Sequence, residues 1–475
     1  MNKSNNSNKH MYVVACRRYL KFFIREAFKV INPGTKFADN WHISLIAEYL
    51  EAVTKGDIKR LIINIPPRAL KSTCISICWP AWLLGNDPGR RIICSSYSQS
   101  LSNKLSLDCR HLMRSRFFGK IFPDTSILAG QNQKNKFVTN MQGFRLATST
   151  AGMITGEGGN FLIVDDPHNA LDVNSAKKRE KVVNWFQQSF SSRLDDKSNG
   201  VIVVVMQRLH VDDLTGFLLS NKSSSNWHLL KIPLMPPNKI IYQINNFWHI
   251  FKEGDFLHNE RDMRKEIDNM KGELGSQVFS AQYLQEPLIF DGGMVQKQWL
   301  KYYAQALKND EYDHIIQSWD TAIKSGDENS FSVCTTWGKL SENFYLLDIF
   351  RGRLEYPDLK KKVIYYAMKC NPDLILIEDK ASGQSLLQDL KRENNDLPLS
   401  SVKVKNDKVY RFARVTTLFE SGRVFLKENA DWLDEYEKEV LTFPYCKHSD
   451  QVDSTSQYMY YVMSNHTTIP RIHRL

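Results

Sequence analysis

Four short apolar runs, separated from one another by helical stretches or loops, dominate the first half of the chain. They span Leu61–Ile65, Arg91–Ser95, Phe161–Val164 and Val201–Val205. Apolar runs of this length, rich in β-branched residues, are typical of strands that are buried on both faces of a parallel sheet. We therefore predict an α/β region with a parallel-rich sheet covered by helices on both sides, extending to about Pro287.

The second half of the chain predicts a different sheet. Strand-like runs at His314–Trp319, Phe331–Trp337 and Tyr345–Phe350 follow one another at short spacing, as in an antiparallel meander. A helical stretch then leads to a further apolar run at Leu374–Ile377. Three close strands, a helix and another strand form the order of an RNase H-like sheet, so a second, mixed α/β domain is expected.

A chain of 475 residues is too long for one ordinary core, so two domains with small additions are expected. We place an N-terminal tail and helical lead-in at residues 1–39, the parallel-rich domain at 40–290, a linker at 291–311 and the mixed domain at 312–475. The polar residues 1–10 are expected to form a frayed tail, because they lack the apolar stretch of a signal peptide.

Charge and composition limit the classes of protein to which this chain can belong. The chain carries 63 basic and 52 acidic residues, a net charge of +11, which fits a polyanionic partner. Its apolar runs are far shorter than the roughly 20 residues of a membrane-spanning helix, so no membrane association is expected. The eight cysteines form no CxxC pair, and a disulfide framework is not expected. Together these features predict an intracellular protein.

The first candidate site follows the first apolar run, in the segment PPRALKST. A turn of backbone N–H groups at a helix N-terminus can cradle phosphates, with a lysine on the β- and γ-phosphates and a hydroxyl on magnesium. Lys71, Ser72 and Thr73 have this strand-to-helix context. The usual glycines are absent, since Ile65 and Leu70 occupy their positions. A nucleotide site and a proline-rich turn with an exposed lysine therefore both remain open.

Two further strand ends add polar residues to this candidate site. Asp165 and Asp166 directly follow the run Phe161–Val164, and Gln207 and Arg208 follow the fourth apolar run. One acid can hold magnesium through water, and the next can orient the water that attacks the γ-phosphate. A polar pair on a neighbouring strand can sense that phosphate. A solvated strand end is the alternative interpretation for each.

Carboxylates recur at strand ends in the second domain. Asp320 and Glu378 each end an apolar strand, and Asp450 and Asp453 share a face near the start of a helix. Two-metal hydrolysis of a phosphodiester needs several carboxylates around hard cations such as magnesium or manganese. The ordered set predicts a metal site made by Asp320, Glu378 and Asp450, with or without Asp453.

Other charged residues near these acids are weaker candidates. Asp379 and Asp327 are second-rank candidates for metal binding. Contacts of basic side chains with a DNA backbone set affinity without reading sequence. The basic residues that are candidates for such contacts are Lys380, Lys403, Lys405, Lys408, Arg411 and Arg414.

The first set of motifs resembles the ATPase half of phage terminase large subunits, the motors that package viral DNA. The matching segments are PPRALKST, WPAWLLGNDPGRRIICSSYS, STAGMITGEGGNFLIVDDPHN, VVVMQRLHVDDLTG and FSAQYLQEP, in family order over about residues 40–290. The resemblance implies a P-loop ATPase domain of the ASCE type. It also implies roles for individual residues, which are phosphate contacts for Arg68 and Lys71, the magnesium hydroxyl for Ser72, Walker B acids for Asp165 and Asp166, and the coupling motif for Gln207 and Arg208.

Two positions depart from the family pattern. Leu70 stands where many terminases have glycine, and Asp166 stands where a glutamate base is usual. A leucine restricts φ relative to glycine, so the loop is expected to cradle phosphate in a form that leucine tolerates. Trp41 and His42 correspond to the place where related motors contact the nucleotide base, and a core tryptophan is the alternative.

The acids of the second domain resemble those of the terminase nuclease. The matching segments are SWDTAIKSGDENSFSVCTTWG, LILIEDKASGQSLLQDL, FARVTTLFESGRVFL and SDQVDSTSQYM. The metal-binding acids of that family correspond to Asp320, Glu378 and Asp450. In the last motif relatives often have two adjacent acids followed by a third, and here Ser449 replaces the first. Asp450 alone, or Asp450 with Asp453, therefore completes the site.

The combined resemblance implies a large terminase subunit that uses ATP and Mg²⁺ to translocate double-stranded viral DNA into a procapsid. Its nuclease would cut the concatemer with Mg²⁺ or Mn²⁺. The implied partners are DNA, a small terminase subunit, the portal protein and further copies in a ring, in the cytoplasm of a bacterial host.

Two rival functions are considered. A repair-type helicase–nuclease needs a second RecA-like domain, for which the segment up to Pro287 is too short. A degenerate prophage copy would bind DNA or partners without turnover, and Leu70 is its main support.

Overall fold

The computed structural model describes residues 2–152, 156–220, 227–259, 261–288, 293–321, 331–379, 381–393, 396–403 and 407–464. The chain divides into two compact units. Unit 1 comprises Met1–Lys271 and Ser276–Leu288, and unit 2 comprises Gly272–Gly275 and Ile289–Leu475. In the described ranges, no helix has the length and apolar character needed to cross a membrane. The weaker candidates Asp327, Lys380 and Lys405 lie outside the described residues.

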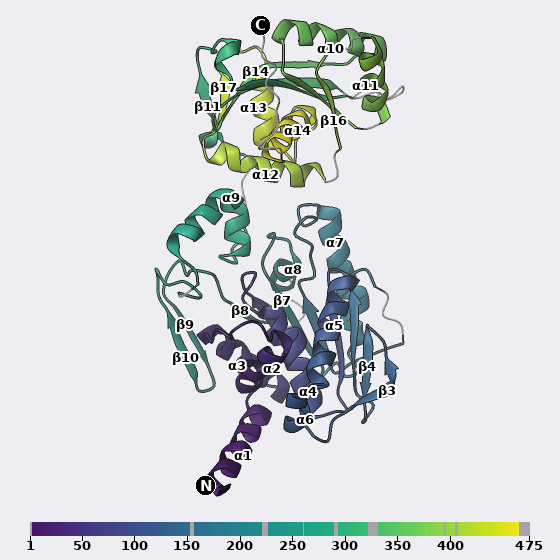
Figure 1. Ribbon diagram of the computed structural model, residues 1–475, viewed down its shortest axis with the longest axis vertical. Coiled ribbons are helices and arrows are strands. Elements are labelled where there is room, and N and C mark those ends of the chain that lie inside the picture. Colours follow the sequence, from purple (N-terminus) through teal and green to yellow (C-terminus); the bar gives the residue numbers. More distant parts are fainter. Residues whose placement is uncertain are drawn as a thin grey trace. The chain divides into compact units, whose positions relative to one another are not determined.

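Unit 1 is built on an eight-stranded sheet in the order β3-β4-β5-β2-β6-β7-β1-β8 (Figure 1). Neighbouring strands are parallel except for the pairs β3–β4 and β4–β5. The predicted parallel-rich α/β fold is thereby confirmed. The strands of the unit are β1 Arg60–Asn64, β2 Arg91–Ser96, β3 Ile127–Asn132, β4 Lys136–Thr139, β5 Phe144–Ser149, β6 Phe161–Asp165, β7 Val201–Met206 and β8 His228–Lys231, with a separate hairpin of β9 Ile240–Ile244 and β10 Phe247–Phe251.

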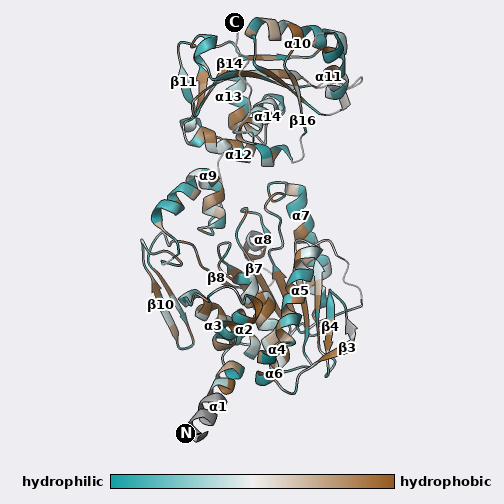
Figure 2. Ribbon diagram, in the orientation of Figure 1, coloured by the Kyte–Doolittle hydropathy of each residue, from teal (hydrophilic) through white to brown (hydrophobic). Residues whose placement is uncertain are grey.

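Helices cover both faces of this sheet because successive strand residues point to opposite sides. Leu61 and Ile63 of β1 pack into a core with α2, α3 and α5, whereas Ile62 packs into a second core with Trp185 and Leu214. Figure 2 colours the central strands as hydrophobic and α7 as largely hydrophilic. The helices of the unit are α1 Asn2–Arg18, α2 Leu20–Ile31, α3 Trp41–Lys55, the π-helix η1 Thr73–Cys78, α4 Trp79–Asn86, α5 Gln99–Met113, α6 Arg116–Ile121, α7 Ala176–Trp185, η2 Phe186–Phe190, η3 Ser191–Arg193, α8 Leu214–Ser220 and α9 Arg264–Gln282, of which residues 272–275 belong to unit 2.

The N-terminal residues form a helix instead of the frayed tail that their composition suggested. Helix α1 begins at Asn2 and continues to Arg18. Its C-terminal half is anchored, because Cys16 is buried and the Arg17 Nε donates to the Ile121 carbonyl of α6. Once such a half is fixed, each further residue adds one backbone hydrogen bond at little cost, so the helix extends toward the chain start.

Unit 2 contains a seven-stranded sheet in the order β11-β17-β14-β13-β12-β15-β16. The predicted meander is present as antiparallel β12–β13–β14, and β15 pairs in parallel with β12. The remaining pairs are parallel. The strands are β11 Lys301–Tyr303, β12 His314–Asp320, β13 Ser332–Leu340, β14 Asn343–Gly352, β15 Leu374–Glu378, β16 Leu399–Val402 and β17 Val424–Lys427.

The described part of the expected linker belongs to the fold of unit 2. Within 291–311, strand β11 pairs with β17 at the edge of the sheet. Val295 and Leu300 are buried in the same core as β12 and β13. A three-residue strand has too few residues for a periodic pattern, which explains why the sequence suggested only a connector.

The two faces of the second sheet carry different helices. Figure 1 shows α10 and α11 on one face and α12, α13 and α14 on the other. Trp319 and Ile377 face the first group, whereas Ile316 and Leu376 face the second. The helices are η4 Lys297–Trp299, η5 Asn309–Glu311, α10 Tyr356–Cys370, α11 Ala381–Glu393, α12 Lys408–Glu420, α13 Leu433–Thr442 and α14 Asp450–Ser464.

Candidate functional sites

The loop after β1 has the strand-to-helix geometry of a phosphate-binding turn. The Leu70 carbonyl accepts a hydrogen bond from the Cys74 N–H at 3.0 Å, so the helix begins directly after Leu70. Two residues of the loop have left-handed backbone, Arg68 with φ 62° and Leu70 with φ 57°. Leucine thus adopts the glycine-like conformation here, at a cost of about 1–2 kcal/mol. Its side chain packs against the core, which offsets part of that strain.

Three predicted residues from three elements meet beside this loop. The Lys71 Nζ lies 2.7 Å from the Asp166 Oδ1 and 3.5 Å from the Gln207 Oε1. The Gln207 backbone N–H also donates to the Asp166 Oδ1, at 3.4 Å. Lys71 is only 6% exposed, so its ammonium group is held in place and paired with a carboxylate. The fold therefore brings the loop lysine, the second acid and the glutamine together.

The first acid, Asp165, is buried at the end of β6 and bound by two hydroxyls. The Ser72 Oγ donates to its Oδ1 at 3.1 Å, and the Ser76 Oγ donates to its Oδ2 at 2.6 Å. Burial and the neighbouring Asp166 charge raise the pKa of Asp165 to about 6, and the Ser76 hydrogen bond opposes that shift. Thr73 begins η1, and the hydroxyl contacts of Asp165 come from Ser72 and Ser76, the residues before and after it on the same helix.

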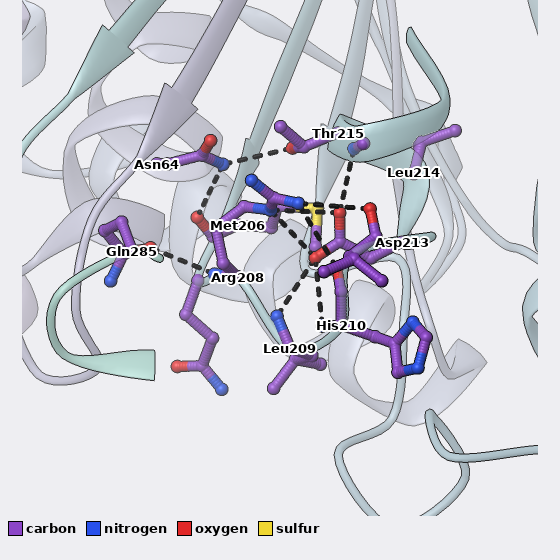
Figure 3. Close-up of polar contacts among 12 residues, drawn as sticks. Asn64, Met206, Arg208, Leu209, His210, Asp213, Leu214, Thr215 and Gln285 are labelled. Carbon is purple, nitrogen blue, oxygen red and sulfur yellow. Dashed lines mark hydrogen bonds and ion pairs between the residues drawn. The ribbon is translucent and has the colours of Figure 1, made fainter. Parts of the chain in front are cut away.

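Of the polar pair after β7, Gln207 faces the acids, whereas Arg208 is bound elsewhere. The Arg208 Nε lies 3.0 Å from both carboxylate oxygens of Asp213, and its Nη2 donates to the carbonyls of His210 and Val211. Figure 3 shows this guanidinium directed at Asp213. The arginine side chain therefore stabilises its own loop.

Asp213 is fully buried and organises that loop. Besides Arg208 it accepts backbone hydrogen bonds from Leu209, His210 and Gly216, at 3.0 to 3.3 Å. The Arg208 N–H donates to the Gln285 Oε1 at 2.9 Å (Figure 3). We call Arg208, Asp213 and the backbone they bind the Asp213 cluster. It fixes the backbone from which Gln207 extends.

Trp41 and His42, the expected contacts of the nucleotide base, belong to the core. The Trp41 ring stacks on His249 of the β9–β10 hairpin with centroids 4.1 Å apart, and it also contacts Tyr242 and Phe251. Trp41 is thus packed among three rings at the margin of the core. His42 is buried, and burial lowers its pKa to about 4. The core-tryptophan alternative thus describes the geometry.

The acids of unit 2 meet at one edge of its sheet. Strands β12 and β15 are parallel with Trp319 opposite Ile377, so Asp320 and Glu378 follow at the same edge. Helix α14 packs along β12 in the opposite direction. Tyr458 stacks on Trp337, the partner of Ile316 on β12, and Ser454 exchanges hydrogen bonds with Ser318.

The start of α14 is consequently directed toward the Asp320 end of β12. Its first backbone N–H groups are held by Glu439 of α13, whose Oε1 accepts from Gln451 and Val452 at 2.8 and 2.9 Å. Glu439 was not predicted from the sequence, because a glutamate on a solvated-looking helix gives no signal of this contact. It fixes the helix end that carries Asp450.

Asp450 and Asp453, which the sequence could not separate, differ in their contacts. Asp453 is paired with Arg411 Nη2 at 3.1 Å and lies 3.8 Å from the Lys408 Nζ. Asp450 is partly buried, and its Oδ2 has no hydrogen-bond partner among the described residues. Burial raises the pKa of Asp450, while the charge of Arg351 opposes that shift. The geometry favours Asp450 as the carboxylate directed at a cation.

The residue types at this edge fit a hard divalent cation. Carboxylate oxygens are the ligands that magnesium prefers, and magnesium keeps several waters instead of requiring a complete protein cage. Among the described residues, no group of three His, Cys, Asp or Glu side chains is already arranged around a metal position. The acids Asp320, Glu378 and Asp450 thus share an edge without forming a closed set of ligands.

The weaker candidates have ordinary protein partners. Asp379 accepts a hydrogen bond from Gln384 at 2.6 Å. Lys408 and Arg411, expected to follow a DNA backbone, are directed at Asp453 instead. Their positive charges lie beside the acids and lower the electrostatic cost of bringing carboxylates together.

Comparison with known proteins identifies the architecture. Residues 317–461 match the family model of the terminase RNaseH-like domain. The large terminase of a thermophilic bacteriophage superposes over 87% of this chain and 98% of its own, with a TM-score of 0.51 and 11% identity.

The same phage protein solved with ADP and with ATP-gamma-S superposes with TM-scores of 0.51 and 0.50 and 11% identity each, covering 87% and 86% of this chain and 98% and 97% of theirs. No protein with a curated description matches the chain. The C-terminal domain is therefore a terminase RNase H-like domain, and the whole chain has the fold of a phage large terminase.

Proposed function

We propose that the chain is the large subunit of a phage or prophage terminase. Unit 1 hydrolyses ATP to translocate double-stranded DNA into a procapsid, and unit 2 cuts the concatemer in a metal-dependent reaction. The single observation that carries the proposal is that each unit gathers its own charged site at strand ends. One site combines Lys71 with Asp165 and Asp166, and the other combines Asp320 with Glu378.

In unit 1 the lysine is the phosphate-binding group. Lys71 is paired with Asp166, and the γ-phosphate of a bound nucleotide would take the place of that carboxylate as its partner. Released from the ion pair, Asp166 is the candidate base that orients the attacking water. Gln207 contacts both groups and is the candidate sensor of the phosphate. The exposed Arg68 and the start of the helix supply further positive potential.

Ser72 and Asp165 are the groups that would hold magnesium with the nucleotide. The hydroxyl and the buried carboxylate already contact each other at 3.1 Å. Both are oxygen donors at the mouth of the phosphate loop, which fits the ion. Bound there, magnesium would neutralise charge that develops on the phosphates.

In unit 2 Asp320, Glu378 and Asp450 would hold the metal ions. Bound metal would supply an activated water and stabilise the leaving oxygen of the phosphodiester. The protein itself fixes the acids through the β12–β15 pairing and the anchored start of α14. The net charge of +11 favours a polyanionic substrate such as DNA.

The proposed partners follow from the family rather than from contacts of this chain. They are double-stranded DNA, a small terminase subunit, a portal ring and other copies of the chain, in the cytoplasm of a bacterial host. ATP-gamma-S and ADP are bound in structures of the thermophilic phage terminase, which has the same fold, and this supports ATP as the nucleotide.

Two variants test the proposal together. Purified protein is expected to cut plasmid DNA with Mn²⁺ or Mg²⁺ and to hydrolyse ATP in the presence of DNA and portal. Asp320→Ala is expected to abolish only cleavage, and Lys71→Ala only hydrolysis. Loss of both activities in either variant would contradict two separate sites. A wild-type protein inactive in both assays would support the degenerate prophage copy.

A further inference from the structure

Behind the first Walker B acid lies a second serine that no motif assigns. Ser76 follows Ser72 by one helical turn, so both hydroxyls lie on the same helix face. Each binds a different oxygen of Asp165, Ser72 the Oδ1 and Ser76 the Oδ2. The Ser76 contact, at 2.6 Å, is the shorter one, and the side chain is fully buried. One helix face therefore holds both oxygens of the carboxylate.

The backbone of Ser76 is unusual as well, because Pro80 stands four residues later. Proline has no N–H, so the Ser76 carbonyl lacks its normal partner in an α-helix. The helix adopts π geometry over Thr73–Cys78, and the Trp79 N–H donates to the Cys74 carbonyl instead. A carbonyl that is freed inside a core needs another donor.

That donor is Arg145 of β5. Its Nη2 lies 3.1 Å from the Ser76 carbonyl, and the whole side chain is buried with no exposed surface. Burying a guanidinium costs free energy of folding unless the group is hydrogen-bonded or paired with an opposite charge. Arg145 lies opposite Ile92 of β2 and so shares its sheet face, the one covered by the core that contains α5. A continuous chain of contacts thus runs from Arg145 through Ser76 to Asp165.

We propose that Ser76 and Arg145 are positioning residues that hold Asp165 for the magnesium ion of bound nucleotide. The inference rests on the proposed ATPase function of unit 1. Ser72 is the hydroxyl expected on the ion, so its bond to Asp165 is the one that nucleotide binding replaces. The Ser76 bond is directed at the other oxygen and stays in place. Asp165 then keeps one oxygen fixed and presents the other to the metal or its water.

The test separates metal binding from nucleotide binding. The affinity of ATP-gamma-S for the full chain is measured with Mg²⁺ and again in EDTA, for the wild type and for Ser76→Ala. Loss of one hydrogen bond to a charged group predicts about tenfold weaker binding with Mg²⁺. Binding in EDTA is expected to stay within about twofold, because Ser76 contacts only the metal-binding acid and not the phosphate loop lysine.

Ser106 provides the matched control. It is a buried serine on α5 in the same unit, and its hydroxyl has no hydrogen-bond partner among the described residues. Ser106→Ala removes the same atom from a similar environment and is expected to leave both affinities unchanged. Melting temperatures of the two variants show whether a general loss of stability explains any difference. Equal effects of Ser76→Ala and Ser106→Ala with Mg²⁺ would overturn the proposal.

The Arg145→Met variant provides a second test of the proposal. If the variant folds, it is expected to show the same selective loss of Mg²⁺-dependent binding as Ser76→Ala. If it does not fold, the comparison of Ser76→Ala with Ser106→Ala alone decides whether the proposal holds. A wild type that binds no nucleotide under either condition would remove the proposed function itself. A wild type with Mg²⁺-dependent binding that Ser76→Ala leaves intact would remove only the positioning role.

Discussion

The two acidic sites of this chain are organised in opposite ways. In unit 1 the carboxylates are satisfied by side chains of the protein, with Lys71 on Asp166 and two serines on Asp165. In unit 2 the acids are positioned by the scaffold, through strand register and the start of α14, and the Asp450 Oδ2 has no hydrogen-bond partner in the described ranges.

This difference indicates which ligand each proposed site depends on. A carboxylate paired with an internal cation can be released when a phosphate binds that cation, so nucleotide binding at the proposed ATPase site would exchange one partner of Lys71 for another. A partly buried carboxylate oxygen without a donor is costly to bury, so a cation bound at the proposed nuclease site would relieve that cost directly. Under the proposed function, occupancy of the first site would depend on the nucleotide and that of the second on the concentration of metal.

The largest expected effect tests how strongly unit 1 depends on internal pairs. Asp213→Ala removes one partner of a buried ion pair and leaves Arg208 uncompensated, which is expected to cost about 3–5 kcal/mol of unfolding free energy. Asp212→Ala is the control, because the Asp212 side chain is 73% exposed. Its expected cost is below about 0.5 kcal/mol. Urea titration measures both, and similar losses would contradict the central role of the Asp213 cluster.

The next effect separates the two acids at the start of α14. Asp450→Asn is expected to slow DNA cleavage about a thousandfold, because a metal-binding acid contributes several kcal/mol to the transition state. Asp453→Asn is expected to slow it less than about tenfold, since Asp453 is already paired with Arg411 and is not expected to bind the metal directly. Cleavage rates at saturating Mn²⁺ check this, and the reverse order would assign the metal to Asp453.

A smaller effect tests the exchange of partners in unit 1. Lys71→Ala is expected to weaken binding of ATP-gamma-S by about 10- to 150-fold, the range for a hydrogen bond to a charged group. Lys59→Ala, an exposed lysine just before β1, is the control and is expected to change little. DNA cleavage by both variants should equal that of the wild type. Equal affinities of the two variants would mean that Lys71 does not contact phosphate.

The smallest effect concerns the departure at Leu70. Because this leucine already has the backbone conformation of a glycine, Leu70→Gly is expected to change nucleotide affinity by less than about threefold. Leu70→Val is expected to weaken it more, since a β-branched residue is a genuine outlier at positive φ. Isothermal titration of the two variants measures the difference. A large gain in affinity for Leu70→Gly would indicate that leucine impairs the loop.

The fold was largely predictable because strand runs such as Phe161–Val164 are apolar on both faces. The side-chain contacts within the two candidate sites were less predictable. Lys71 and Asp166 were predictable from their places after strands. Ser76 was not, because a serine inside an apolar helix gives no signal until its spacing from Ser72 and from Pro80 is combined with the path of β5. Arg208 was expected to sense phosphate, and only the tertiary position of Asp213 reveals its present partner.

The ring stack between Tyr458 and Trp337 helps to fix the position of α14 on the sheet of unit 2. The ring centroids are 5.3 Å apart with nearly parallel planes, and Asp450 lies eight residues before Tyr458, about 12 Å along the same helix. Because one continuous helix carries both residues, a shift of the Tyr458 ring would also displace the Asp450 carboxylate. Since a misplacement of about 1 Å can reduce a rate about a hundredfold, the rate of the proposed DNA cleavage would depend on this ring packing in the core of unit 2. A substitution that shifts the stack is therefore expected to reduce the proposed cleavage before it unfolds unit 2.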